Sequence, residues 1–507
     1  MRATSPTVTN AMQLLEIYLL PMDPQRFSAI ATRSPTGDGA AESRLPFWDG
    51  ECDRLSTLIK TLELSSGFNA AAFPNAEERA WMKESELLSV DGKGFHPDYL
   101  KTIGKVLYQA LFPSGSRLRT CLESSLRMAE QVGEDLHLRL KFADDSAERS
   151  RLADYPWELI HDGQRFLLQH GVVMSRYIAY EALAPKLPKA TQIKVLLISS
   201  GAADKQMGLY KLPEDERKAV HEGLSKAQDS GAVALGQLTK PTLRALSIYL
   251  TDCAETPQVI HFDGHGLYGK RCGNPDCLKI HPGIKVMRCS QCGQSLPSPE
   301  GFLVFEDEQG DPDYVSAVDF GMRLPQAVAL VVLSACQSGM AVASQSLFSG
   351  VAQQLMDARV PAVVAMQYAV RVDAASQFAE QFYRVLGKRE PLTVALQAGR
   401  KWMRPMLNQW YRPVLYLRWQ DNAGGQLFAE DTSARLNSSL SRFDRLQRDR
   451  WIEELGDWEQ HYASVQAQLR IETNPVTRNR LKHQIAQIGT EMDECERRLS
   501  QLEAKGE

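Results

Sequence analysis

Residues 327–339 read AVALVVLSACQSG, an uncharged apolar run that ends in small residues around a cysteine. A second short apolar run, QVIHF at 258–262, is followed directly by DGHG at 263–266. Runs of this length and composition predict buried strands of a parallel sheet. In open α/β sheets ligands bind outside the carboxyl ends of the strands, so we expect Cys336 and His265 to lie at the same edge of one sheet.

The same alternation of strands and helices extends on both sides of these runs. Strands are predicted at 194–200, 361–368 and 413–419, and helices at 212–228, 239–252, 346–358, 373–387 and 391–404. Nearer the N-terminus the patterns predict one or two strands within 12–45, two helices within 78–132 that break at 112–115, and a strand at 137–142. Alternation at this spacing predicts an α/β fold with a mostly parallel sheet flanked by helices.

Cys336 and His265 together suggest nucleophilic catalysis. A thiolate attacks a carbonyl group far better than a thiol does, and a neighbouring imidazole both takes the thiol proton and later protonates the leaving amine. Gly266 has no Cβ atom, so its N–H group can approach a developing oxyanion, with the Cys336 N–H as the second donor. For Cys336 alone the alternative is a buried small hydrophobic residue, and the pairing with His265 favours the nucleophile.

Asp263 lies two residues before His265. Its carboxylate could face the substrate-binding pocket and favour a basic residue before the scissile bond. The alternative is an aspartate that stabilises a turn at the end of the strand, since DGHG is itself expected to form a turn there.

Four cysteines follow in one short window. CGNPDC runs from Cys272 to Cys277, and CSQC runs from Cys289 to Cys292. Two close pairs joined by a short loop supply the tetrahedral thiolate set that Zn²⁺ prefers, and a closed four-thiolate shell leaves no position for catalysis. We therefore expect a structural zinc site, with free thiols or a redox switch as alternatives and His281 as a spare ligand. A module at this place could act as a lid, a substrate-docking surface or a sensor.

The overall composition argues against several classes of protein. The 507-residue chain has a net charge of -4 and a pI near 6.3, which does not suit a protein that coats nucleic acid or adsorbs to membranes. No apolar run approaches the ~20 residues that span a bilayer, and the N-terminus lacks a signal-peptide pattern. Nine cysteines, four of them clustered, suit a reducing compartment. We expect a cytoplasmic protein, and nucleic-acid binding by basic residues of the zinc module stays an alternative.

Beyond residue 430 the hydrophobic residues recur every three or four positions, as from Leu455 to Leu469 and from Leu481 to Leu502. An Asn-Pro pair separates the two stretches, and proline suits the first turn of the second helix. This pattern predicts a helical hairpin with coiled-coil seams. It fits equally a bundle packed on its own core and a role in oligomerisation or partner docking.

The motifs HFDGHG at 261–266 and LSACQSG at 333–339 resemble those of the caspase-like CHAT peptidases, in the clan that also contains caspases and separases. The resemblance extends to YPWELIHD at 155–162, to residues 360–400 and to RPVLYLRW at 412–419. It covers roughly residues 12 to 420. Family members cut polypeptides, often one specific protein encoded nearby, in prokaryotic defence or cell-death pathways.

This resemblance implies that His265 is the catalytic histidine, that Cys336 is the nucleophile and that His261 is structural. The sequence departs from the caspase signature, which has glutamine two residues before the cysteine and the histidine about 50 residues upstream. Here Ser334 takes the first position, and His265 lies 71 residues before Cys336. Removing the 21 residues that span the four cysteines restores a separation of 50, so the cluster is interpreted as an insertion into the catalytic unit.

The sequence therefore predicts four segments: an N-terminal α+β part of the CHAT region at 1–190, a caspase-like catalytic part at 191–425, a zinc-ribbon insertion at 270–298 and a helical hairpin at 430–507. We expect a cysteine endopeptidase that cleaves a specific protein partner in a defence or regulated cell-death pathway. An activating partner or self-association is expected to act through the C-terminal helices. The alternative is a non-enzymatic caspase-like adaptor or sensor that binds a partner or nucleic acid through the zinc ribbon and the coiled coil.

Overall fold

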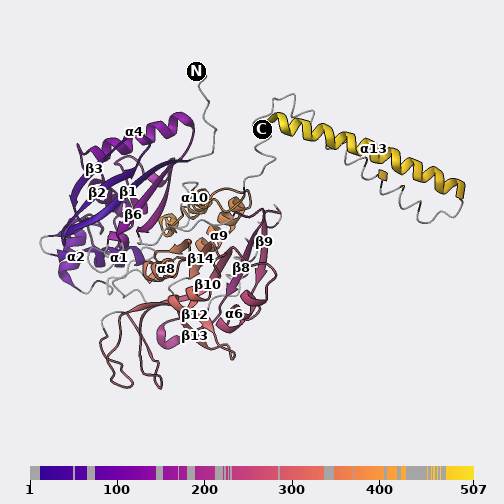
Figure 1. Ribbon diagram of the computed structural model, residues 1–507. Coiled ribbons are helices and arrows are strands. Elements are labelled where there is room, and N and C mark those ends of the chain that lie inside the picture. Colours follow the sequence, from indigo (N-terminus) through magenta and orange to yellow (C-terminus); the bar gives the residue numbers. More distant parts are fainter. Residues whose placement is uncertain are drawn as a thin grey trace. The chain divides into compact units, whose positions relative to one another are not determined.

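A computed structural model gives the arrangement of the chain (Figure 1). It describes residues 12–49, 52–64, 73, 75–143, 152–169, 171–179, 189–211, 218, 221, 224–225, 228, 231–283, 286–335, 347–368, 370–404, 408–419, 424–429, 451, 454, 458, 461–462, 465, 469 and 475–506. The chain divides into two compact units, Met1–Phe428 and Ala429–Glu507.

A mixed sheet, with 14 strands among the described residues, runs through the first unit. Its N-terminal half contains β1 (Gln13–Asp23), β2 (Arg26–Arg33), β3 (Ala40–Arg44), β6 (Leu136–Ala143) and β7 (Val172–Ala179). Strands β1, β6 and β7 are parallel, and β2 and β3 are added antiparallel at the edge. A separate hairpin consists of β4 (Trp48–Asp49) and β5 (Cys52–Asp53).

The other half of the sheet carries the two motifs. It contains β8 (Ile193–Ser199), β9 (Val233–Gln237), β10 (Val259–Arg271), β11 (Ile280–Pro282), β12 (Glu300–Glu306), β13 (Pro312–Ser316), β14 (Leu330–Ala335), β15 (Ala362–Met366) and β16 (Pro413–Leu417). Strands β9, β8, β10, β14 and β15 are parallel. Strand β16 is antiparallel to β15 and parallel to β7, so it joins the two halves into one sheet.

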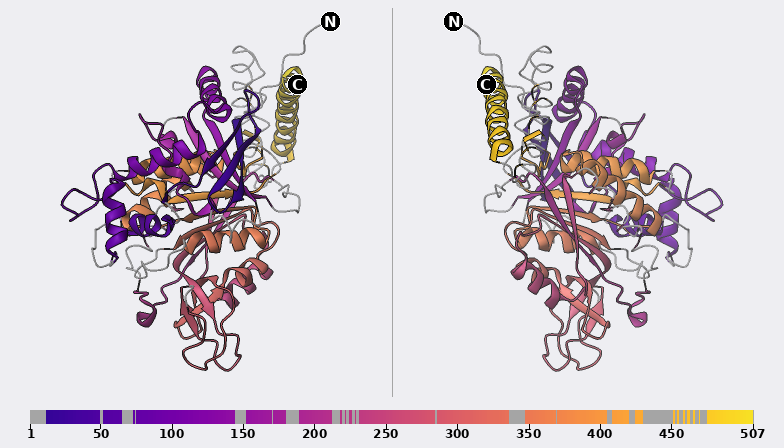
Figure 2. Two further views of the ribbon diagram at one scale, coloured as in Figure 1. Left: turned by 90° about the vertical axis from the view of Figure 1, so that its left-hand side faces the viewer. Right: turned by 90° about the vertical axis from the view of Figure 1, so that its right-hand side faces the viewer.

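Helices cover both faces of the sheet (Figures 1 and 2). They are α1 (Leu55–Glu63), α2 (Ala76–Glu84), α3 (Tyr99–Leu111), α4 (Arg117–Val132), α6 (Leu243–Asp252), α7 (Ala317–Met322), α8 (Leu347–Asp357), α9 (Val372–Leu386) and α10 (Leu392–Met403). Side chains alternate along a strand, so neighbouring residues of β10 enter different cores. Phe262 packs in the core that holds α6, α7 and α8, whereas Val259 packs in the core that holds α9 and α10.

The predicted α/β class with a helix-flanked sheet is confirmed, but the sheet is less parallel than predicted. Antiparallel strands β2, β3 and β16 lie within it, and β11, β12 and β13 extend it beyond the motif strands. The patterns did not predict β7, β9, β12 or β13. The predicted helix at 212–228 lies mostly outside the described residues. The described residues within this range, 218, 221, 224, 225 and 228, are helical.

A buried cluster of charges ties together segments that are far apart in the sequence. Arg176, on β7, donates hydrogen bonds to both carboxylate oxygens of Glu158, which lies in the YPWELIHD segment, and to the side-chain oxygen of Gln367 at 3.0 Å. Arg400, on α10, lies 3.9 Å from the same carboxylate. All three charged side chains are almost completely buried. Burial lowers the pKa of Arg400 to about 10, with the Glu158 carboxylate opposing that shift.

We predict that Glu158→Gln lowers the free energy of unfolding of the first unit by about 3–5 kcal/mol, because it leaves two buried guanidinium groups without their counter-charge. Urea unfolding followed by tryptophan fluorescence measures the change. The matched control is Glu255→Gln, since Glu255 pairs with Lys194 at the surface, where an ion pair contributes less than about 1 kcal/mol. Equal effects of the two substitutions would contradict this account of the cluster.

His261 lies in the core between β10 and α9. Its ring is fully buried, and Nδ1 lies 2.9 Å from the hydroxyl of Tyr383. Burial lowers the pKa of His261 to about 3, so the ring stays neutral at neutral pH. These contacts agree with the structural role expected for this residue.

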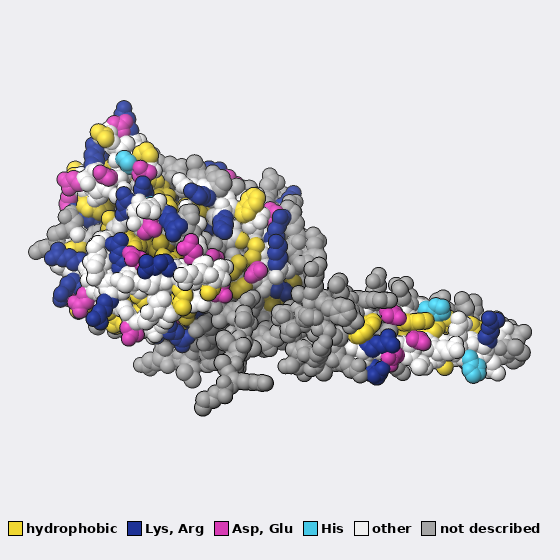
Figure 3. Space-filling model, turned by 90° about the horizontal axis from the view of Figure 1, so that it is seen from above, with side chains coloured by type: hydrophobic (Ala, Val, Ile, Leu, Met, Phe, Trp, Pro, Cys, Tyr) yellow, Lys and Arg dark blue, Asp and Glu magenta, His cyan; other side chains and the backbone are white. Residues whose placement is uncertain are grey.

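The second unit contains α13 (Pro475–Gly506), which begins at the predicted proline. Leu481 and Ile488 of this helix are buried against Val465 in a small separate core, and the described residues between 451 and 469 are helical. On the face drawn in Figure 3, the described part of the second unit carries basic, acidic and histidine side chains beside hydrophobic ones.

None of the described helices is both long enough and apolar enough to span a membrane.

The buried, neutral His261 predicts an acid-sensitive fold. The unfolded chain binds a proton on this residue below pH ~6.5 and the folded chain does so only below about 3, so the free energy of unfolding falls as the pH drops through that window. The slope for one proton is about 1.4 kcal/mol per pH unit. We expect His261→Gln to remove that part of the slope in unfolding titrations between pH 6.5 and 5. His137 is also buried, and burial lowers its pKa, but it contributes the same slope in the wild-type chain and in the variant. An unchanged slope in the variant would therefore refute the assignment.

Candidate active site and cysteine cluster

Strand β10 passes through the predicted catalytic segment without turning. Its first half, up to Gly264, pairs in parallel with β8 on one side and β14 on the other. From His265 onward it pairs antiparallel with β12 and then with β11. The prediction that DGHG forms a turn is therefore wrong. The strand continues because β12 supplies new backbone hydrogen-bonding partners where β8 and β14 end.

The register of β10 and β14 brings the two motifs together. Their last described pair is Gly264 with Ala335, the residues immediately before His265 and Cys336. Cys336 itself lies outside the described residues. The structure thus places the end of β14 beside the start of the second half of β10, where His265 stands.

His265 is fully buried, and a backbone carbonyl contacts its ring. Nε2 lies 2.6 Å from the carbonyl oxygen of Tyr210. Because a carbonyl oxygen can only accept a hydrogen bond, the geometry assigns the proton to Nε2 in the neutral ring and leaves Nδ1 as the atom that can accept one. Sequence reasoning missed Tyr210, since a backbone carbonyl leaves no signature in the residue type. The Tyr210 side chain itself is 61% exposed.

Asp263 and Gly266 lie within β10, on either side of His265. Asp263 is buried, and its neighbours in register are Ser199 on β8 and Ser334 on β14. The alternative interpretation of Asp263 as a turn-stabilising residue is therefore excluded by its place inside a paired strand. Side-chain alternation places Asp263 on the same face of the sheet as His265. Gly266 pairs in register with Leu303 of β12.

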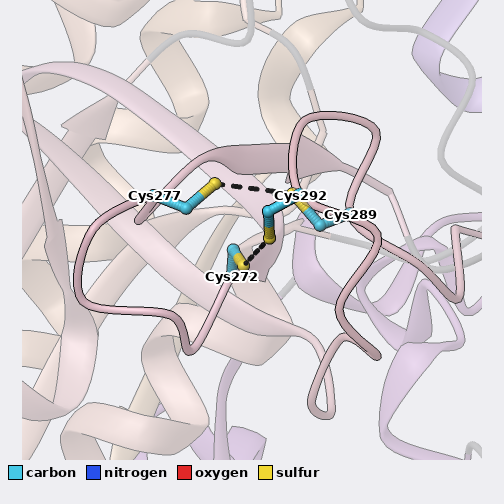
Figure 4. Close-up of side chains that lie close together, drawn as sticks. All are labelled: Cys272, Cys277, Cys289 and Cys292. Carbon is cyan, nitrogen blue, oxygen red and sulfur yellow. Dashed lines mark hydrogen bonds between the residues drawn. The ribbon is translucent and has the colours of Figure 1, made fainter.

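The four clustered cysteines converge in space (Figure 4). The sulfur atoms of Cys272 and Cys292 are 3.4 Å apart, those of Cys277 and Cys289 are 3.6 Å apart, and all four lie within 4.8 Å of one another. Four thiolates around one Zn²⁺ at ~2.3 Å would be separated by about 3.8 Å, so this cluster could hold such an ion.

Two further contacts act on the sulfur of Cys289. The Nε2 atom of His281 lies 3.3 Å from it, and the backbone N–H of Gln291 donates to it at 3.4 Å. His281 thus contacts one sulfur from outside the set of four. Its place beside a sulfur suits a hydrogen-bonding partner of a ligand, which holds that ligand in orientation.

The cysteine cluster begins directly after the end of β10. Cys272 follows the last residue of β10, and β11 folds back antiparallel on β10 with Gly269 opposite Pro282. A Cβ atom on Gly269 would lie 2.3 Å from the carbonyl oxygen of His281, so only glycine permits this close approach. The cysteine segment projects from the sheet, as Figure 2 shows.

Comparison with known proteins gives two family matches. The family model described as CHAT domain matches residues 102–427, and the one described as Effector-associated domain 9 matches residues 441–502. No curated protein matches the chain. A similar solved structure is that of the Saccharomyces cerevisiae separase–securin complex, at 12% sequence identity and a TM-score of 0.34, over 80% of this chain and 30% of that chain.

The match to the CHAT domain covers well over half of the chain and includes β10, β14 and the strands around them. The protein therefore belongs to the CHAT family of caspase-like cysteine peptidases.

Proposed function

We propose that the protein is a cysteine endopeptidase in which Cys336 is the nucleophile and His265 the base. The observation that carries the proposal is the pairing of Gly264 with Ala335, which fixes the backbone on the N-terminal side of both residues. Cys336 directly follows Ala335, the partner of Gly264, and consecutive Cα atoms are only about 3.8 Å apart, so the pairing of Ala335 limits how far Cys336 can be from β10. The family membership supports the same assignment.

The chemistry follows from the contacts of His265. With its Nε2 proton held by the Tyr210 carbonyl, the ring presents Nδ1 to take the thiol proton of Cys336. The thiolate attacks the carbonyl carbon of the peptide bond, and the imidazolium then protonates the departing amine, which leaves a thioester on the sulfur. Water, deprotonated by the same ring, hydrolyses the thioester and restores the thiol. We assign the oxyanion to the backbone N–H groups of Gly266 and Cys336.

The proposed substrate is a specific polypeptide, encoded nearby and cut in a prokaryotic defence or regulated cell-death pathway. Asp263 supports a preference for a basic residue before the scissile bond, because its buried carboxylate lies on the face of the sheet that carries His265. The match of residues 441–502 to an effector-associated domain supports recruitment or activation by a partner through the C-terminal helices.

We predict that Cys336→Ala and His265→Ala each lower the rate of peptide cleavage at least about a thousandfold, since both groups act in the same proton transfer. An electrophilic peptide should label the wild-type chain at Cys336 and neither variant, as read by mass spectrometry. Cys253→Ala is the matched control, because Cys253 is a half-buried thiol at the end of α6, away from the dyad. Cleavage that survives Cys336→Ala would leave the non-enzymatic adaptor as the better account.

We further propose that Cys272, Cys277, Cys289 and Cys292 hold one structural Zn²⁺. The four sulfur atoms lie within 4.8 Å of one another, close enough to surround one ion, and the donors are the thiolates that zinc prefers. Four protein ligands close the shell, so the ion would stabilise the insertion and would take no part in peptide hydrolysis. Binding of the ion would hold the cysteine loops in place between β10 and β11.

Elemental analysis of the purified chain is expected to give one zinc per chain, and Cys289→Ser is expected to lose it because only three thiolates remain. Cys52→Ser serves as the control, since Cys52 is an exposed thiol on β5, in the N-terminal part of the first unit. Zinc content that is the same in both variants would refute the site.

A further inference from the structure

The insertion and the turn that precedes Tyr210 are packed together. Met207 and Tyr314 lie against two small apolar clusters at once. One cluster contains Leu267 of β10, Ile280 of β11 and Phe302 of β12, and the other contains Ala202, Leu209 and Val304. Ile280 comes from the insertion, so a residue between the two cysteine pairs shares its packing with the turn at 205–207.

Hydrogen bonds hold this turn in one conformation. The hydroxyl of Tyr314, on β13, donates to Oδ2 of Asp204 at 2.8 Å. The other carboxylate oxygen accepts from the backbone N–H groups of Gln206 and Met207, at 3.0 and 3.2 Å. Asp204 and Leu209 also exchange two backbone hydrogen bonds of 2.9 and 2.8 Å. The turn is therefore closed at its base immediately before Tyr210.

The same turn delivers the carbonyl that contacts His265. Tyr210 follows Leu209 directly, and its carbonyl oxygen is the acceptor for Nε2 of His265. On the other side, the guanidinium of Arg271 donates to the backbone carbonyl of Tyr314 and lies 5.0 Å from the ring of Phe302. Arg271 is the residue before Cys272. One chain of contacts thus runs from the first cysteine through Tyr314 and Asp204 to the ring of His265.

We propose that Tyr314 and Asp204 are positioning residues through which the folded cysteine insertion sets the reactivity of the dyad. The inference rests on the proposed function and adds a control to the same site. When the insertion is folded, Arg271 and Ile280 hold β13 and the turn, and the Tyr210 carbonyl keeps His265 in the tautomer that accepts the thiol proton. When the insertion loses its structure, the turn loses its anchor and the ring loses its orientation.

The side chain of Tyr314 suits this role because it stays a donor. Burial, with the Asp204 carboxylate, raises the pKa of the phenol, so the hydroxyl keeps its proton. Tyr314→Phe removes only that hydroxyl and keeps the ring in both apolar clusters. It therefore separates the hydrogen bond from the packing.

The inference is tested by the rate at which iodoacetamide alkylates Cys336. The rate is measured at several pH values by mass spectrometry of the peptide that contains Cys336. In the wild-type chain the rate is expected to depend on His265, and Tyr314→Phe should lower the rate at pH 7 about tenfold by moving the thiol pKa up by about one unit. The matched control is Tyr155→Phe, which removes a buried tyrosine hydrogen bond to the carbonyl of Pro46, away from the turn. A purely structural effect of Tyr314→Phe would leave the pH profile unshifted.

A second substitution tests the coupling to the insertion. Cys292 is exposed, so Cys292→Ser disturbs the four-sulfur set without opening a core. We expect it to slow alkylation as Tyr314→Phe does, and the double variant to be no slower than either single variant, because both act along one chain of contacts. Independent, multiplying effects would overturn the inference.

The outcomes for the inference and for the proposed function differ. If the wild-type profile depends on His265 but Tyr314→Phe and Cys292→Ser leave it unchanged, the inference fails and the dyad stands. If the pH profile of His265→Ala is the same as that of the wild-type chain, the dyad itself fails, and the inference fails with it.

Discussion

The site depends on the register between β10 and β14. That ladder runs unbroken from Val259 opposite Leu330 to Gly264 opposite Ala335, its last described pair, which directly precedes the two motif residues in the sequence. A shift of one residue would move every side chain of β10 to the other face of the sheet, and His265 with them. The two cores on either side prevent such a shift, since Val259 and Phe262 would have to exchange environments.

The same strand explains how the fold accommodates an insertion close to His265. The first half of β10 is fixed by parallel neighbours on both sides, so its position does not require the cysteine segment. The second half belongs to the antiparallel group of β11, β12 and β13, which carries the insertion. His265 stands at the boundary. Its backbone is set by the sheet, whereas its ring is contacted by a turn that packs against the insertion.

Much of this architecture could be predicted from the sequence. Long apolar runs such as 327–335 and helices with a clear 3.6-residue period were placed correctly, because burial on one or both faces leaves a strong pattern. The four cysteines were also predicted to gather, since cysteine pairs at that spacing have few other uses. The turn expected at DGHG was wrong because β10 continues through this segment by pairing with β12, which begins 35 residues after His265, so the pairing is not local.

Other parts of the site had no local signal. The acceptor for His265 is the backbone of Tyr210, and the Tyr314–Asp204 hydrogen bond joins residues 110 positions apart. The buried Glu158 pairs with arginines of β7 and α10, which lie far from it in the sequence. Such contacts follow from how strands are ordered in the sheet, which a single sequence does not encode in any short window.

Chemical cross-linking between positions 265 and 336 tests the central claim most directly. A chain carrying His265→Cys is treated with a short bifunctional thiol reagent, and the joined peptides are identified by mass spectrometry. The account predicts a cross-link between the introduced cysteine and Cys336. It predicts none in a chain carrying Tyr268→Cys, where alternation places the new thiol on the opposite face of the same strand. Absence of the first cross-link, or equal yields in the two chains, would contradict the claim that the sheet brings His265 and Cys336 together.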